Sequence, residues 1–205
     1  LKGRLLKDQA KRADGSERVR LYHAAADAYE AAADLRSDSY ALINAAALAL
    51  LGGKPERSAE LATQVLALVD GNPDEGENIY WRGATRAEAL LLMGQETEAR
   101  AALTDAIAQL PDAWEDHAAT LGQFSLILAE QGRDAHWLDR HRPPTAVHFS
   151  GAMQLIDEAR VGAAIGDFIA RVQPGFAYGA LAAGSDLLFA QAFLNHKVEH
   201  DTPAE

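Results

Sequence analysis

Two short glycine-containing turns carry the residues of this chain whose types are suited to binding a phosphate. Ser150-Gly151 follows the apolar run Thr145–Phe149 (TAVHF), and Gly184-Ser185-Asp186 follows the run Gly175–Ala183 (GFAYGALAA). Each turn precedes a helical pattern, where glycine lets a phosphate approach the backbone amides of a helix N-terminus. A turn followed by an N-cap is the simpler interpretation. The candidate ligand-binding residues are Ser150, Gly151, Gly184, Ser185 and Asp186.

A second set of candidate residues lies in the first part of the chain, which is rich in Ala and Leu. Stacked helix pairs expose a concave groove that is lined by the first helix of each pair. We favour a helix-to-helix hydrogen bond for Asn44 and a core or inter-repeat contact for Trp81. No cluster of Lys and Asn has the spacing that would hold a peptide carboxylate. The candidates to line or rim the groove and bind a protein partner are Asn44, Trp81, Arg82, Arg86 and Glu88.

No arrangement in the sequence indicates catalysis or a metal centre. The histidines are scattered, and no pair has metal-ligand spacing with a carboxylate on one helix face. His148 is the histidine nearest the glycine turns, and we favour a structural role for it. The sequence also lacks a Gly-x-Ser-x-Gly elbow, a Walker loop and a pair of acids suited to catalysis. We therefore assign no catalytic residue and no metal ligand.

The double proline Pro143-Pro144 separates two kinds of sequence pattern. Two proline rings fix φ and remove two backbone donors, so no helix continues through them. We expect residues 1–142 to form a helical repeat domain and residues 145–205 to form an α/β unit. The predicted fold is mainly α, with a tetratricopeptide-like helical repeat stack followed by a small, incomplete Rossmann-like α/β unit.

Amphipathic patterns interrupted by glycine or proline predict the helices before the double proline. Small residues recur at tetratricopeptide spacing: Ala25 and Ala59 lie 34 residues apart. Small side chains at such positions let two helices approach closely. Another all-α bundle is the alternative. The predicted helices are Leu1–Arg12, Glu17–Leu35, Tyr40–Leu51, Glu56–Val69, Asn78–Met93, Glu96–Leu110, Ala113–Gln131 and, shorter, Ala135–Arg140.

Apolar runs and helical patterns alternate after the double proline. The runs Thr145–Phe149 and Gly175–Ala183 predict strands, and the segments Ile156–Val172 and Leu187–His196 predict helices. This alternation is typical of a parallel sheet with helical crossovers. We expect a third strand near Val198, because a sheet of two parallel strands leaves both edges unpaired.

Two N-terminal blocks carry a resemblance to a known family. Leu1–Asp8 (LKGRLLKD) and Tyr40–Leu51 (YALINAAALALL) resemble the atypical tetratricopeptide region of the apoptosis signal-regulating kinases and their bacterial relatives. The chain departs from that family at Ala41-Leu42, where a Pro-Gly pair is expected. The resemblance covers about the first 140 residues. It implies a regulatory, protein-binding helical region.

The segment Gly175–Leu194 (GFAYGALAAGSDLLFAQAFL) resembles the second βα unit of the SLOG superfamily of Rossmann-like sensors, which includes the LOG proteins. The resemblance implies a nucleotide or nucleotide-derived ligand at the two glycine turns. The chain departs from the family at two places. Gly151-Ala152 stands where the family usually has Gly-His, and Gln191 stands where it usually has a glutamate. An amide cannot act as a base at neutral pH, so Gln191 favours a sensor over a hydrolase.

The composition excludes some classes of binding partner and indicates where in the cell the protein acts. The formal net charge of −11 argues against nucleic acid and against anionic membranes as partners. The chain has no cysteine, and its longest apolar run, Ala45–Leu51, is far shorter than the ~20 residues of a spanning helix. No secretory leader pattern opens the chain, which starts at Leu1. We expect a cytoplasmic protein, part of a longer chain, with a solvated basic helix face at Lys2, Arg4, Lys7, Lys11 and Arg12.

These observations favour a non-enzymatic regulatory or scaffold protein. The helical repeats would bind a protein partner, and the α/β part would sense a nucleotide-type ligand. A LOG-like nucleotide glycosidase is one alternative. A plain tetratricopeptide interaction module, in which the α/β part only caps the stack, is the other.

Overall fold

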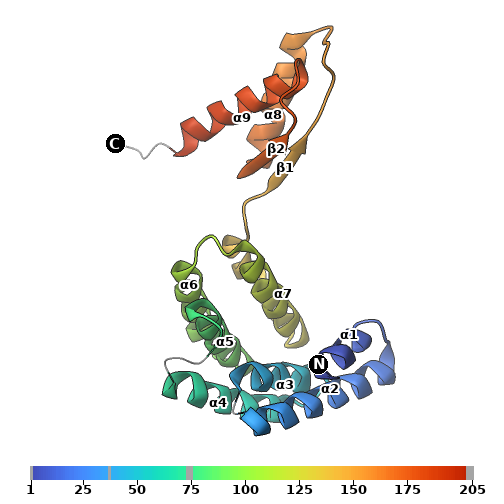
Figure 1. Ribbon diagram of the computed structural model, residues 1–205, viewed down its shortest axis with the longest axis vertical. Coiled ribbons are helices and arrows are strands. Elements are labelled where there is room, and N and C mark those ends of the chain that lie inside the picture. The colour runs from blue at the N-terminus through green and yellow to red at the C-terminus, as the bar shows by residue number, and fades with distance from the viewer. Residues whose placement is uncertain (1, 37, 73–75, 202–205) are drawn as a thin grey trace. The chain divides into compact units, whose positions relative to one another are not determined.

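The computed structural model describes residues 2–36, 38–72 and 76–201 and is mainly helical, with a small two-stranded parallel sheet. The chain forms two compact units, Leu1–Arg142 and Pro143–Glu205. The boundary between them falls at the double proline, where neither ring offers a backbone donor to continue a helix. Figure 1 shows the helices of the first unit and the mixed α/β structure of the second.

The first unit contains every helix that the sequence patterns predict. Each of α1 to α6 packs on its neighbour in the chain, and α3 also contacts α5 and α7. Helix α5 contacts α7 as well, and a 3₁₀ helix, η1, packs on α7. The elements are α1 (Lys2–Ala10), α2 (Gly15–Arg36), α3 (Ser39–Leu51), α4 (Pro55–Gly71), α5 (Ile79–Leu92), α6 (Glu96–Gln109), α7 (Trp114–Glu130) and η1 (His136–His141).

Local sequence sets the ends of these helices. The Asp38 side chain accepts a hydrogen bond from the Tyr40 amide at the start of α3, and Asn78 does the same for Trp81 at the start of α5. Pro55 opens α4, where a missing amide proton costs nothing. Gly94 follows α5 with a φ of 78°, a left-handed conformation that favours glycine and turns the chain into α6.

Helix α3 lies at the centre of the first unit's core. All seven residues of Ala45–Leu51 are buried, and Ala45, Ala46, Ala47 and Leu48 have no exposed surface. A helix that is apolar on all sides is stable only when other helices surround it. Helices α2, α4, α5 and α7 supply that cover, so α3 fixes the positions of its neighbours.

Close helix approach occurs where small residues meet. Gly83 of α5 faces Ala106 of α6, and a Cβ added at Gly83 would lie 2.8 Å from the Ala106 Cβ. Ala25, Ala87 and Ala99 are fully buried in the same core. The sequence pattern of small residues therefore marks positions where helices contact each other.

The second unit has the order strand, helix, strand, helix. Its elements are β1 (Ala146–Phe149), α8 (Glu158–Val172), β2 (Phe176–Gly179) and α9 (Ser185–Asp201). The strands are parallel, and Val147 pairs with Ala177. Phe149 stacks on Phe189 of α9 at 4.8 Å between ring centroids, which joins one face of the sheet to that helix.

Two expectations for the second unit are wrong. Strand β2 ends at Gly179 rather than at Ala183. The residues near Val198 continue helix α9 and form no third strand. The helix persists because Leu187–His196 has a helical pattern that no glycine or proline interrupts before Pro203.

The second proline of the boundary packs within the α/β unit. A Cβ added at Gly175 would lie 1.9 Å from the Pro144 Cβ, so glycine leaves the space that the ring occupies. The amides of Gly175 and Phe176 both donate to the Thr145 carbonyl, at 2.9 and 3.3 Å. Strand pairing thus begins directly after Pro144.

We predict that Gly83→Ala destabilises the protein by about 1–3 kcal/mol, because the new methyl group overlaps Ala106. The matched control is Gly122→Ala on α7, where an added Cβ meets no atom within 4 Å. That control should stabilise the protein by roughly 0.5–1 kcal/mol, because alanine favours a helix interior. Urea unfolding followed by circular dichroism measures both, and equal effects would contradict the close packing of α5 on α6.

Candidate functional site

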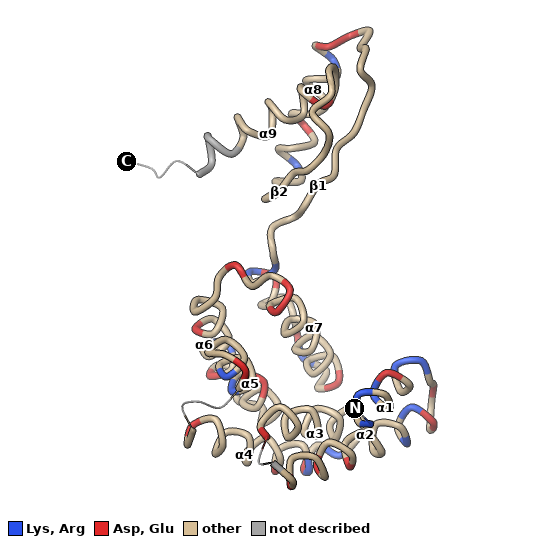
Figure 2. The backbone as a smooth tube through the Cα atoms, viewed as in Figure 1, with Lys and Arg blue, Asp and Glu red and all other residues tan. Residues whose placement is uncertain are grey.

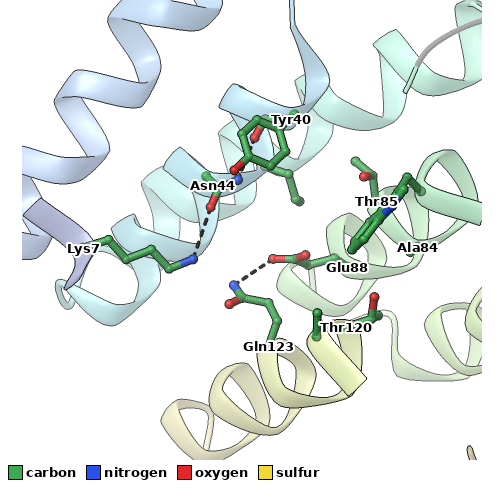
Figure 3. A pocket seen from close by; sticks show the side chains of 11 residues that line it. Lys7, Tyr40, Asn44, Ala84, Thr85, Glu88, Thr120 and Gln123 are labelled. Atoms are coloured by element: carbon green, nitrogen blue, oxygen red, sulfur yellow. Dashed lines mark hydrogen bonds between the residues drawn. The ribbon is translucent and has the colours of Figure 1, made fainter. Parts of the chain in front are cut away.

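One pocket lies in the helical unit at the meeting of α1, α3, α5 and α7. We call it the central pocket, and its volume is about 230 Å³. Figure 3 shows polar side chains from separate helices pointing into it. The residues that line it are Lys7, Tyr40, Ile43, Asn44, Trp81, Ala84, Thr85, Glu88, Ala119, Thr120 and Gln123.

A hydrogen bond between α1 and α3 forms one wall of the central pocket. The Lys7 Nζ donates to the Asn44 Oδ1 at 3.2 Å, and the Asn44 Nδ2 donates to the Tyr40 carbonyl at 2.9 Å. The helix-to-helix hydrogen bond favoured for Asn44 is thus present. This bond joins two residues that are 37 positions apart in the sequence.

The opposite wall carries a carboxylate that is partly withdrawn from water. The Gln123 Nε2 of α7 donates to the Glu88 Oε1 of α5 at 3.0 Å. Desolvation raises the pKa of Glu88 from 4.5 to about 7, although the Gln123 hydrogen bond and the Lys7 charge both act to lower it. Desolvation likewise lowers the pKa of Lys7, and the Glu88 charge opposes that shift. The two opposite charges therefore act on each other across the pocket.

Lys7 differs from the other residues of the basic cluster. Lys2 and Arg4 are exposed on α1, and Lys11 and Arg12 are exposed in the turn that follows it rather than on the helix. Figure 2 shows basic residues on α1 and at the start of α2. Lys7 is half-buried and points into the central pocket instead (Figure 3). Its long apolar stem permits this placement, since the stem packs in the wall while the ammonium meets Asn44.

Three of the five predicted partner-binding residues meet in the central pocket, and two do not. Asn44, Trp81 and Glu88 line it. The Trp81 ring also packs on Tyr80 with the centroids 5.3 Å apart, so the core contact favoured for Trp81 is present. Arg82 and Arg86 line a separate pocket between α5 and α6.

The two arginines bind the C-terminal end of α4. The Arg82 guanidinium donates to the Val69 carbonyl at 2.7 and 3.1 Å, and the Arg86 Nε donates to Asp70 at 2.9 Å. Carbonyls in the last turn of a helix lack intrahelical partners, and cations stabilise that end. Arg82 and Arg86 thereby fix α4 against α5.

The two glycine turns of the α/β unit come together in the structure. A Cβ added at Gly151 would lie 1.9 Å from the Ser185 Oγ, so the first turn packs directly on the start of α9. The Ser185 amide and hydroxyl both donate to the Ala152 carbonyl, at 3.1 and 3.3 Å. Gly184 has a φ of 86°, which a residue with a side chain adopts only under strain. Ser150 is exposed beside them.

Asp186 is the unusual residue of this second site. It is 4% exposed, and its Oδ1 is buried without a hydrogen-bond partner among the described residues. A buried polar oxygen is normally paired, so this one offers an acceptor to an incoming donor. Gln191 is exposed, and its Nε2 donates to the Asn195 Oδ1 at 2.9 Å, along the surface of α9.

His148 lies on the exposed face of β1 and packs on Tyr178 with ring centroids 5.0 Å apart, a structural contact. Within residues 2–36, 38–72 and 76–201, no three His, Asp or Glu side chains are grouped to hold a metal ion. In the same residues, no helix has both the length and the apolar character needed to cross a membrane.

No protein-family model, no curated protein and no solved structure matches this chain.

The sequence analysis missed several residues of the central pocket, chiefly Lys7, Gln123 and Thr120. Thr120 accepts a hydrogen bond from the Tyr80 hydroxyl at 2.7 Å, which joins α5 to α7. The sequence does contain one indication of these residues, because Thr120 and Gln123 are polar residues one helical turn apart, next to the apolar Leu121 and Phe124. In the structure Thr120 is buried together with Leu121 and Phe124. Polar residues on the buried side of a helix indicate a pocket or a helix-to-helix bond.

We predict that Glu88→Gln stabilises the protein at pH 8 by on the order of 1–3 kcal/mol. The pKa of Glu88 is raised on folding, so between pH 4.5 and about 7 the folded state binds more protons than the unfolded state. The free energy of unfolding therefore falls as the pH rises through this range, and glutamine removes that loss.

Urea unfolding at pH 4 and pH 8 checks this prediction. The gain from Glu88→Gln should be much smaller at pH 4, which lies below both pKa values, because the carboxyl is then mostly protonated in both states. Glu98→Gln, at an exposed position of α6, is the control and should change the stability by less than about 0.5 kcal/mol at both pH values. A Glu88→Gln variant that is less stable than the parent at pH 8 would refute the raised pKa.

Proposed function

We propose that this chain is a non-enzymatic regulatory or scaffold protein of the cytoplasm. Its helical unit, a tetratricopeptide-like repeat stack, binds a protein partner at the central pocket. Its Rossmann-like α/β unit binds a nucleotide-type ligand. The resemblance of the N-terminal blocks to a regulatory tetratricopeptide region supports the first assignment, and the resemblance of Gly175–Leu194 to SLOG sensors supports the second.

The central pocket is the observation that carries the protein-binding proposal. Its lining combines an exposed aromatic ring at Tyr40, a half-buried one at Trp81 and hydrogen-bonding groups from separate helices. Binding hot spots on proteins have this composition, with an aromatic anchor and a few oriented polar groups. The first helices of successive pairs supply the lining, which is how repeat stacks build a binding surface.

We predict that peptides selected from a displayed random library on the full chain bind at the central pocket. Trp81→Ala and Asn44→Ala should each weaken a selected peptide at least tenfold, because the first removes the aromatic wall and the second frees Lys7 from its partner. Fluorescence anisotropy with labelled peptides measures the affinity.

Arg86→Ala is the matched control for the peptide experiment. Arg86 lies on the same helix as Trp81 but lines the separate pocket beside α6, so its loss should leave peptide affinity within twofold. Melting curves confirm that each variant is folded. Selected peptides that respond to Arg86→Ala and ignore Trp81→Ala would place the binding surface elsewhere.

A second candidate function rests on the unpaired Asp186 oxygen in the α/β unit. A buried carboxylate beside glycine turns accepts hydrogen bonds from ligand hydroxyl groups, such as those of a ribose. The Ala152 carbonyl already holds the Ser185 amide, so a phosphate at that amide would displace the loop of residues 150–153. The glycosidase alternative lacks support at Gln191, whose amide bonds to Asn195.

We predict that calorimetric titration of the full chain with AMP, ADP, ATP and NAD detects a ligand that Asp186→Ala weakens at least tenfold. Asp186→Ala removes the unpaired Oδ1, and a melting curve confirms that the variant is folded. Asp167→Ala, at an exposed position of α8, is the control and should bind as the parent does. Uniform absence of heat across this panel would remove the nucleotide-binding part of the proposal.

A further inference from the structure

Each of the two charged residues of the central pocket forms a hydrogen bond with a neutral amide side chain. Lys7 uses one of its three N–H donors on Asn44, and Glu88 accepts one hydrogen bond, from Gln123, in the described part of the chain. Figure 3 shows the ammonium and the carboxylate approaching the pocket from facing sides. The pocket therefore presents spare donors on one wall and a spare acceptor on the other.

This arrangement selects for ligands with two opposite charges. A cation would be attracted by Glu88 and repelled by Lys7. An anion would be attracted by Lys7 and repelled by Glu88. A ligand that carries both charges satisfies both walls and brings no net charge into a partly desolvated site. Charge-assisted hydrogen bonds are roughly twice as strong as neutral ones, so a zwitterion gains more than a neutral amide of similar shape.

The remaining lining sets the size and the side chain of the ligand. Ile43, Ala84, Ala119 and the Trp81 ring provide apolar surface next to the two charged groups. The volume of about 230 Å³ is below the ~300–1,000 Å³ of pockets that enclose drug-sized ligands. A single amino acid with an aliphatic side chain fits this combination of charge, surface and volume.

We propose that the central pocket binds a small zwitterion, a free α-amino acid with an apolar side chain, whose ammonium meets Glu88 and whose carboxylate meets Lys7. Asn44 and Gln123 are positioning residues, because each holds one of the charged side chains. This function goes beyond the binding of a protein partner. When the amino acid fills the pocket, the surface that the pocket exposes depends on the concentration of this metabolite.

The decisive experiment compares L-leucine with two analogues that each lack one charge. Calorimetric titration of the full chain at pH 8, where Glu88 is ionised, uses leucine, 3-methylbutylamine and 4-methylpentanoate. Leucine should bind at least tenfold more tightly than either analogue. Absence of leucine binding, or equal binding of the three compounds, would overturn the proposal without the need for any variant.

Two variants test which charged group of leucine binds to Glu88 and which binds to Lys7. Glu88→Gln should weaken leucine at least tenfold and make it bind no better than 4-methylpentanoate, because the ammonium no longer has a partner. Lys7→Met should weaken leucine similarly and make it equal to 3-methylbutylamine. Glu98→Gln on α6 and Lys11→Met in the turn after α1 are exposed matched controls and should bind leucine within twofold of the parent.

Proton release gives an independent readout. At pH 7 about half of the Glu88 carboxyls carry a proton, and an ammonium bound beside them drives ionisation. Leucine binding should then release up to about 0.5 proton, seen as a dependence of the binding heat on the buffer, and Glu88→Gln should abolish that dependence. Peptide binding through Trp81 is measured separately, so failure of one proposal leaves the other testable.

Discussion

The structure of the helical unit depends on one constraint: the run Ala45–Leu51 of helix α3 has no polar side to turn toward water. This run of alanine and leucine must be covered on every face, and α2, α4, α5 and α7 provide that cover. Because α5 and α7 both pack against α3, their inner faces are brought together beside α1. The central pocket exists where these inner faces carry polar rather than apolar side chains.

The polar lining of the central pocket works against the stability of the folded chain. A cation and a carboxylate are partly removed from water. Each accepts or donates one hydrogen bond with an amide side chain, and the two charges act on each other only across the pocket. Apolar residues of similar size would serve the packing of α1, α3, α5 and α7 equally well. Functional sites commonly retain such unfavourable groups, because the groups that destabilise the empty site also stabilise its ligand.

Local patterns were sufficient to predict the helices, the parallel strands and the place where the chain divides. Glycine and proline mark the ends of these elements, and each signal lies within a few residues of its effect. The sites depended on contacts between distant residues. Lys7 meets Asn44 across two helices, and no spacing in the sequence encodes that approach. Arg82 and Arg86 looked equivalent to Trp81 and Glu88 in the sequence, yet the helical rotation turns them toward α4 and α6.

The contact between Pro144 and Gly175 has a consequence for how the parallel strands align. A slip of β2 by one residue would bring Pro174 or Phe176 opposite the Pro144 ring, and neither leaves the space that glycine leaves. Such a slip would also move the side chains of β2 to the opposite face of the sheet. The second proline of the boundary therefore also helps to fix the register of the two parallel strands.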